Sequence, residues 1–110
     1  MDIREEPRGG AYLVAASGRL DSNSAAALEA VLPARVQANE KLVLDLADVP
    51  YVSSAGLRVL LIGAKAARSG GHKLVLCGLS PSVREVFDIS GFTSIFAIEP
   101  DVDSALAALG

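Results

Sequence analysis

Short apolar runs that alternate with helix-like stretches constrain the fold of this chain more than any other feature. Residues 12–16, 41–46 and 72–77 are apolar runs of strand length, which suits strands buried in a sheet. A weaker edge strand at residues 2–6 precedes them, followed by a hairpin turn at residues 7–10. Strands that alternate with helices predict an α/β fold, with a mixed, mostly parallel sheet of about five strands and about four helices.

Sequence signals for helix starts and ends lie between these runs. A helix from residue 25 toward residue 37 contains Pro33, which should kink or shorten it. The remaining expected elements are a helix that starts at Ser80 and Pro81 and ends at Gly91, a strand at residues 94–98, and a final helix capped by Asp101 or Asp103.

The central helix, which begins at Ser53 or Ser54 and ends near Gly70, carries two apolar stripes. The spacing i, i+3, i+4, i+7 predicts a core stripe of Leu57, Leu60, Leu61 and Ala64, packed with Val43 of the preceding strand. A second stripe, beside the polar Arg58, packs under a neighbouring helix or meets a partner; it consists of Val59, Ile62 and Ala66.

Length, charge and cysteine content narrow the class of protein. The 110 residues fit one domain, residues 1–110, and a net charge of −3 with scattered basic residues argues against nucleic acid as a partner. The single Cys77 lies in an apolar run and is expected to be a buried structural thiol. The charged first ten residues do not resemble a secretory signal, and no charge-free apolar stretch reaches the roughly 18 residues of a membrane span. We therefore expect a cytoplasmic protein that is not bound to a membrane.

The segment from Asp45 to Leu57 is the most unusual part of the chain, because a strand ends in Asp-Leu and two serines open the next helix. The hydroxyls of Ser53 and Ser54 can accept hydrogen bonds from the free N–H groups of the first helical turn. The same N–H groups and the helix dipole would also favour a phosphoryl group there. The serines are therefore either helix caps or the site of a phosphoserine switch, while Asp45 is expected to hold the turn backbone.

Catalysis is not indicated by the remaining residues. His72 is the only histidine and follows two glycines, which is typical of a solvated loop residue. The segment 53–56 is not the Gly-x-Ser-x-Gly elbow of hydrolases, and no spacing of His, Cys and carboxylates predicts a metal site. We expect no cofactor, no metal and no enzymatic activity.

The stretch LVLDLADVPYVSSAGLRVLL resembles the signature of STAS domains, the family of sulfate transporter and anti-sigma factor antagonist domains. Gly18-Arg19-Leu20-Asp21 resembles the family's turn before its first helix, and Ser90-Gly91-Phe92 resembles its helix stop. The resemblance covers nearly the whole chain, and in size the chain is similar to the free-standing bacterial anti-sigma factor antagonists.

This resemblance implies a partner-switching cycle. The antagonist binds an anti-sigma factor that is also a serine kinase, and so frees a sigma factor, regulating transcription indirectly. The kinase phosphorylates a serine of the antagonist, the complex dissociates, and a metal-dependent serine phosphatase resets the cycle. A phosphoserine carries about −1.5 to −2 charges, which are costly in a desolvated interface.

One departure from the family pattern concerns the phosphoacceptor. When the chain is aligned on the family pattern Asp-Ser-Ser-Gly-Leu, Ala55 occupies the position of the usual phosphoacceptor serine. We therefore expect Ser54 to be the acceptor, with Ser53 as the second candidate. A member that is not phosphorylated and binds constitutively is a further alternative. The residues expected to contact the partner are Asp21, Ser53, Ser54, Gly56, Arg58, Val59 and Ile62.

A second hypothesis keeps the resemblance to the STAS family but assigns the chain a different role. The chain would then be a scaffold or sensor domain, such as a stressosome-like or transporter-associated STAS domain, that binds a nucleotide or a small anion without phosphorylation. Binding of a kinase-type anti-sigma factor, with and without ATP, separates the two readings.

Overall fold

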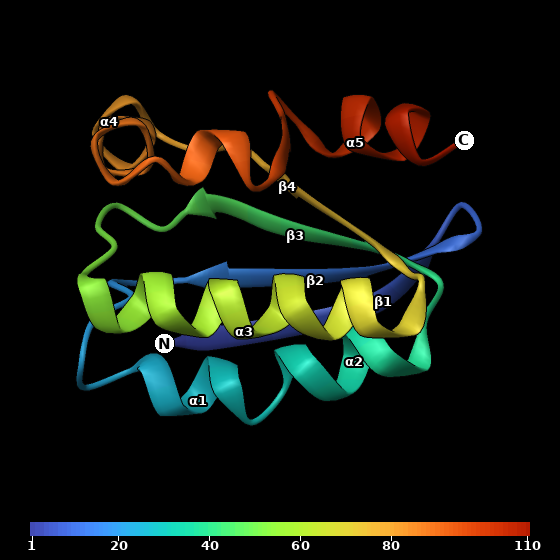
Figure 1. Ribbon diagram of the computed structural model, residues 1–110, viewed down its shortest axis with the longest axis horizontal. Helices are drawn as coiled ribbons and strands as arrows, with labels where there is room; N and C mark the ends of the chain where they lie inside the picture. The colour runs from blue at the N-terminus through green and yellow to red at the C-terminus, as the bar shows by residue number, and fades with distance from the viewer.

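Five strands form one sheet in the computed structural model, which describes residues 1–110 (Figure 1). They lie in chain order across the sheet: β1 (Asp2–Arg8), β2 (Ala11–Ser17), β3 (Lys41–Asp48), β4 (Lys73–Cys77) and β5 (Ala97–Glu99). β1 is antiparallel to β2, and all other neighbours are parallel. The predicted α/β fold with a mixed, mostly parallel sheet is therefore confirmed.

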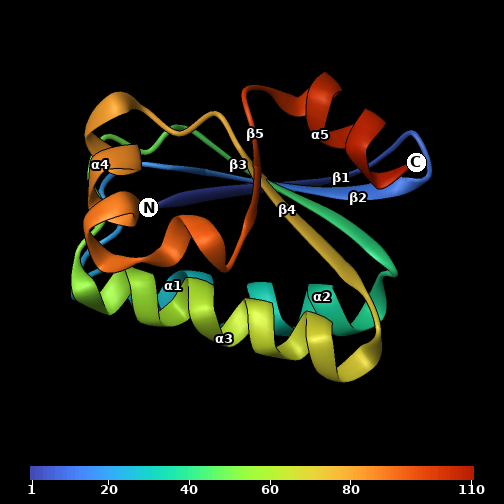
Figure 2. The ribbon, with the colours of Figure 1, turned by 45° about the horizontal axis from the view of Figure 1, so that its top comes forward.

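Helices cover the two faces of the sheet unequally (Figures 1 and 2). They are α1 (Ala25–Glu29), α2 (Leu32–Ala38), α3 (Ser54–Gly70), α4 (Pro81–Ser90), the short 3-10 helix η1 (Phe92–Ser94) and α5 (Val102–Leu109). One face carries α1, α2 and α3, and α4 contributes to the same core, whereas α5 packs on the opposite face. None of the helices combines the length and apolar character needed to cross a membrane.

Alternate side chains of β3 enter separate clusters on the two faces of the sheet. Leu42, Leu44 and Leu46 belong to the larger cluster, which includes residues of α1 to α4. Val43 belongs to the smaller cluster under α5. All four side chains are fully buried, as expected for a central strand covered on both faces. The prediction that Val43 is a core residue is confirmed.

Small residues set the rotation of α3. Gly63 is buried, and a Cβ there would lie only 2.7 Å from Leu32 Cδ2 of α2. This close approach turns α3 so that Leu57 and Leu60 are buried, while Leu61 is only half-buried at the margin. The prediction of core positions is confirmed for Leu57 and Leu60 and wrong for Leu61. Ala64 is also only partly buried, although it packs against the large cluster.

Pro33 divides the first predicted helix. α1 ends at Glu29, and α2 starts at Leu32 with Pro33 in its first turn. In a first turn the missing N–H of proline costs little, but its ring does not fit the interior of a continuous helix. The expected interruption at Pro33 is confirmed, and it produces two short helices.

Caps fix the ends of the last two helices where the sequence predicted them. Ser80 Oγ accepts a bond from the N–H of Val83 over 3.3 Å, and Asp101 Oδ1 accepts one from Ser104 over 2.8 Å. Gly91 ends α4 with φ +75°, a left-handed conformation that favours glycine. Of the two aspartates expected as the cap of α5, Asp101 is therefore the one used.

The last strand begins later than predicted. Only Ala97–Glu99 pairs with β4, so the strand expected at residues 94–98 is wrong in its first half. Phe92 and Phe96 both pack against Phe87, with their own ring centroids 6.0 Å apart. An extended strand would hold positions four residues apart at roughly 13 Å. The turn at η1 replaces the strand because it lets both rings reach the core.

Candidate functional site

Two loops meet at the edge of the sheet where β2 and β3 end. The N–H of Leu20 donates to the carbonyl of Tyr51 over 2.9 Å, and the N–H of Ser53 donates to the carbonyl of Leu20 over 2.9 Å. These bonds form a parallel bridge between Leu20 and Val52. Because both loops follow parallel strands, they lie together at the carboxyl edge of the sheet, where open α/β folds form their binding sites.

The two serines that open α3 have different surroundings. Ser53 is the N-cap and is half-buried, and its Oγ accepts a hydrogen bond from the N–H of Gly56 over 3.4 Å. Ser54 is the first residue of the helix and is exposed, and its hydroxyl forms no hydrogen bond within the protein. The cap is therefore provided by Ser53, and the hydroxyl of Ser54 is free at the positive end of the helix dipole.

Gly56 holds the helix against the loop. It is buried, and a Cβ at this position would lie 2.6 Å from Leu20 Cγ and 2.8 Å from the Leu20 carbonyl oxygen. A glycine is thus required for the first turn of α3 to pack on the loop after β2. Because Gly56 is buried, the expectation that it contacts a partner is wrong, and it shapes the site by this close approach instead.

Charged and aromatic groups border the serines on the side of the loop after β2. The Arg19 guanidinium lies over the ring of Tyr51, 4.3 Å from its centroid, in a cation–π contact. The Asp21 carboxylate accepts the N–H of Asn23 over 3.0 Å and lies 3.5 Å from Arg19 Nε. The pKa of the Asp21 carboxyl group is lowered below its usual value, most strongly by the hydrogen bond from the Asn23 N–H and to a smaller extent by Arg19 and Ser24. Asp21 is thus an ionised residue that organises its own turn.

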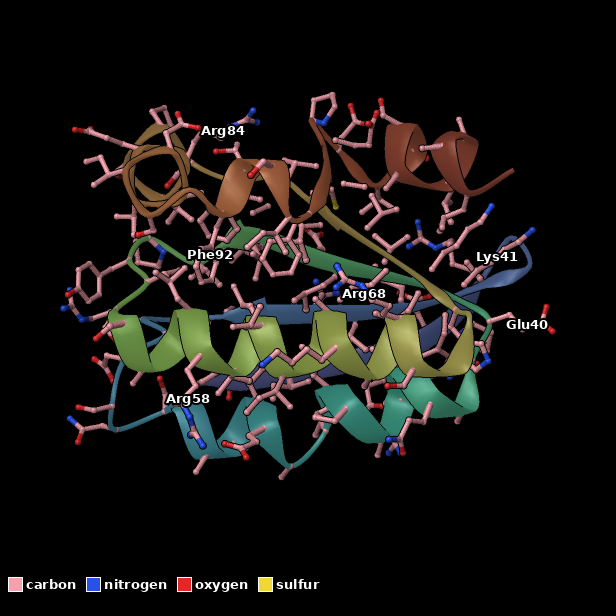
Figure 3. The ribbon with its side chains drawn as sticks, viewed as in Figure 1. Glu40, Lys41, Arg58, Arg68, Arg84 and Phe92 are labelled. Carbon is pink, nitrogen blue, oxygen red and sulfur yellow. The ribbon has the colours of Figure 1, made fainter.

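The outer face of α3 continues the site away from the loops. Ser54, Arg58 and Ile62 follow one another at i, i+4, i+8 and therefore lie on one side of the helix. The Arg58 side chain is 73% exposed and reaches toward α1, where its Nη1 lies 3.9 Å from Glu29 Oε1 (Figure 3). Ile62 is half-buried. This outer face of α3 is accessible along its first two turns.

Val59 does not belong to this accessible face. Its side chain is only 1% exposed and lies in the large core cluster. The glycines of α3 bring this side of the helix against its neighbours, so a partner cannot touch Val59. The expectation that Val59 contacts a partner is wrong.

A comparison with protein families decides the class of the domain. The model of the STAS domain family matches residues 2–105. This chain belongs to the STAS domain family. The match spans all five strands and both loops of the site, so the exposed serine at the start of α3 lies within the matched residues.

Relatives of this STAS domain carry names from one regulatory class. The chain is 48% identical over 109 residues to BtrV of Bordetella bronchiseptica, named as a candidate anti-sigma factor antagonist, covering 98% of this chain and 94% of that protein. It is 29% identical over 111 residues to the anti-sigma F factor antagonist of Paenibacillus polymyxa, covering 99% and 92%. A solved anti-sigma factor antagonist from Mycobacterium paratuberculosis aligns with a TM-score of 0.89 at 28% identity, covering 98% and 92%. These names support the regulatory function that the sequence predicts.

Three other residues, Asp45, Cys77 and His72, have structural surroundings that do not point to chemistry. Asp45 Oδ1 accepts the N–H of Ala47 over 3.0 Å, which confirms that Asp45 holds the turn backbone. Cys77 is fully buried as expected, and burial raises the pKa of its thiol to about 12. His72 is half-buried, with Nδ1 2.8 Å from the Val36 carbonyl oxygen, so the expectation of a solvated histidine is wrong. No group of three or more His, Cys, Asp and Glu side chains could hold a metal ion.

Two features of the site could not be found by sequence reasoning. The contact between Arg19 and Tyr51 joins loops on different strands, and no local pattern predicts such a pairing. The proximity of Arg58 and Glu29 likewise depends on how α1 packs beside α3. The spacing along α3 is enough to place Arg58 beside Ser54, but the approach of α1 to Arg58 depends on the tertiary fold.

Substitution of Gly56 by alanine should destabilise this STAS domain. The new methyl group would overlap Leu20 and its backbone carbonyl, and overpacking of this kind costs about 1–3 kcal/mol of unfolding free energy. Chemical denaturation measures the loss. Gly70→Ala is the matched control, because its Cβ would approach only His72, at 3.4 Å, and alanine favours the helix. Equal stability of the two variants would argue against the close packing of α3 on Leu20.

Proposed function

We propose that this STAS domain is an anti-sigma factor antagonist that binds a serine-kinase anti-sigma factor and thereby frees a sigma factor. The observation that carries the proposal is the exposed hydroxyl of Ser54 at the start of α3, in line with Arg58 and Ile62 on one accessible helix face. No histidine, lysine or carboxylate forms a hydrogen bond with Ser53 or Ser54, which favours binding over catalysis by these hydroxyls. The names of the relatives support the same role.

Phosphorylation of Ser54 by the bound kinase is the proposed switch. A phosphoryl group at Ser54 adds about −1.5 to −2 charges, which would be costly in an interface from which water is excluded. In the free protein the same group would lie at the positive end of the helix dipole, with Arg58 one turn away. Modification therefore favours the dissociated form, and a metal-dependent serine phosphatase is the proposed enzyme that restores binding.

Ser53 is the second candidate for the acceptor. Its hydroxyl is half-buried and accepts the N–H of Gly56, so a kinase would have to draw it out of the cap. Ser54 requires no such rearrangement. The difference in accessibility between the two hydroxyls is the reason for placing Ser54 first.

The proposed contact surface combines the two loops with the outer face of α3. Asp21 and the serines lie at the loop end, and Arg58 and Ile62 extend the surface along the helix. Gly56 lies beneath this surface, where its close contact with Leu20 holds the first turn of α3 against the loop. The proposed partner is an intracellular regulator of transcription, so the proposal places this STAS domain in the cytoplasm.

A binding experiment with a kinase-type anti-sigma factor tests the proposal. We expect a stable complex by calorimetry in the presence of ADP, and dissociation after incubation with ATP, together with the addition of one phosphoryl group to the STAS domain by intact mass. Absence of a complex with any kinase-type anti-sigma factor encoded beside it would contradict the antagonist role.

A negative charge at Ile62 should weaken this complex more than it destabilises the fold. Ile62→Asp puts a carboxylate on a half-buried position of the proposed surface, where desolvation on binding would be costly. Ile89→Asp is the matched control, because Ile89 is 79% exposed on α4, outside the proposed surface. Calorimetry gives the affinity and thermal unfolding gives the stability. A lowered melting temperature with unchanged affinity would identify Ile62 as a purely structural residue.

The scaffold or sensor role remains the alternative, and Ala55 at the usual acceptor position is the observation that favours it. In that case a nucleotide or small anion would bind without covalent change. Calorimetry with ATP and with inorganic phosphate, in the absence of any kinase, distinguishes this role from the antagonist role.

A further inference from the structure

The sheet has an open edge between α3 and α5. β5 pairs with β4 only from Val75 to Cys77, so Lys73 and Leu74 of β4 have no neighbour on that side. α3 lies on one face of the sheet and α5 on the other, and both extend beside this unpaired part of β4. The short last strand thus leaves a groove between two helices at the end of the sheet opposite to the serines.

This groove is apolar and roomy. Its volume is about 460 Å³, and nine of its twelve lining residues are hydrophobic. The half-buried Leu74 and the exposed Ile95 supply accessible apolar side chains, while alanines on both helices leave the space unfilled. The volume lies within the range typical of small-molecule sites, roughly 300–1,000 Å³.

The charged residues of the groove are all basic. Arg68 from the last turns of α3 and Lys73 at the start of β4 line it, and neither forms an ion pair with a carboxylate of the protein. In Figure 3, Arg68 extends from α3 toward the layer that holds β5 and α5. His72 also lines the groove, but its Nδ1 is already hydrogen-bonded to the Val36 carbonyl oxygen. No acidic residue lines the groove, although the chain has a net charge of −3.

We propose that this groove binds a small amphipathic carboxylate with an apolar body. The apolar body would lie along Leu74 and Ile95, and the carboxylate would pair with Arg68 and Lys73. An extended peptide added to β4 is disfavoured, because only Lys73 and Leu74 precede the paired region, whereas strands usually need at least about three residues. The groove favours an anionic ligand, because the only charged side chains that line it are cationic.

The groove is separate from the proposed partner surface. Arg68 lies fourteen residues after Ser54 on the same helix, which corresponds to about 21 Å along the axis. Binding of a carboxylate here does not depend on the antagonist role, and either proposal can fail without the other.

Calorimetry with sodium decanoate, below its micelle-forming concentration, tests the proposal. We expect saturable binding of one decanoate per chain. Butyrate, which has the same carboxylate but little apolar body, and decyltrimethylammonium, which has the same chain but a positive head, should not bind detectably. Equal binding of the cation would overturn the proposal, since it would show that any surfactant chain attaches to the protein.

Paired variants locate the binding. Ala108→Trp should fill the groove and weaken decanoate binding about tenfold or more, whereas Ala107→Trp, at an exposed neighbouring position outside the groove, should not. Arg68→Gln should weaken binding about two- to fivefold, whereas Lys65→Gln, one turn earlier, should not.

Unchanged affinity in both Ala108→Trp and Arg68→Gln would overturn the proposal. So would the absence of any decanoate binding to the unaltered chain. Self-association that Ala108→Trp abolishes would identify a second copy of the chain as the occupant and would equally overturn it.

Discussion

Truncation of Leu60 to alanine should lower the free energy of unfolding by about 2–5 kcal/mol. Leu60 is fully buried in the middle of α3 and belongs to the large core cluster together with Leu44 and Leu76 of the sheet. Removal of its isobutyl group forfeits the burial of that surface and leaves a cavity that the surrounding packing can only partly close. Denaturant titration followed by circular dichroism gives the loss directly.

Leu61→Ala is the matched control for this prediction. The two leucines are adjacent on the same helix, but Leu61 is only half-buried. The smaller loss of buried surface should make the cost of Leu61→Ala clearly lower than that of Leu60→Ala. Equal losses of unfolding free energy in the two variants would contradict the rotation of α3 in the structure. They would instead support the core stripe that the spacing alone predicts, in which Leu61 is also a core residue.

The contrast between these leucines shows what periodicity can and cannot predict. The i, i+3, i+4, i+7 spacing locates the buried side of α3 to within one residue, because it depends on helix geometry alone. The exact rotation depends on how closely neighbours approach, and here Gly63 admits Leu32 to the helix backbone. That contact joins α3 to α2, so it could not be recognised before the packing of the two helices was known.

The candidate site divides in the same way. Its local parts, the helix start at the serines and the backbone role of Asp45, were predictable because side-chain capping and turn bonds act over two or three residues. Its non-local parts were not. The contact of Arg19 with Tyr51 and the burial of Val59 both depend on loops and helices brought together by the sheet.

Replacement of Ser54 by alanine should abolish phosphorylation by the cognate kinase and leave binding of the unmodified protein nearly unchanged. The Ser54 hydroxyl makes no hydrogen bond within the protein, so its removal should hardly alter stability. Ser53→Ala is the control. It should still be phosphorylated at Ser54, although loss of the cap should destabilise the fold by about 1 kcal/mol. Intact mass after incubation with kinase and ATP measures the modification, and calorimetry with ADP measures the binding.

Ser54→Asp should weaken kinase binding only in part. A carboxylate carries about one charge and fewer acceptor oxygens than a phosphoryl group, so it pairs less well with Arg58 and costs less when it is desolvated. Phosphorylation that persists in Ser54→Ala and disappears in Ser53→Ala would show that the cap residue is the acceptor. An active kinase that modifies neither serine of the unaltered protein would leave both hydroxyls without a role in switching. The free hydroxyl of Ser54 would then be one more exposed group at a helix start, and release of the partner would have to depend on a change outside this STAS domain.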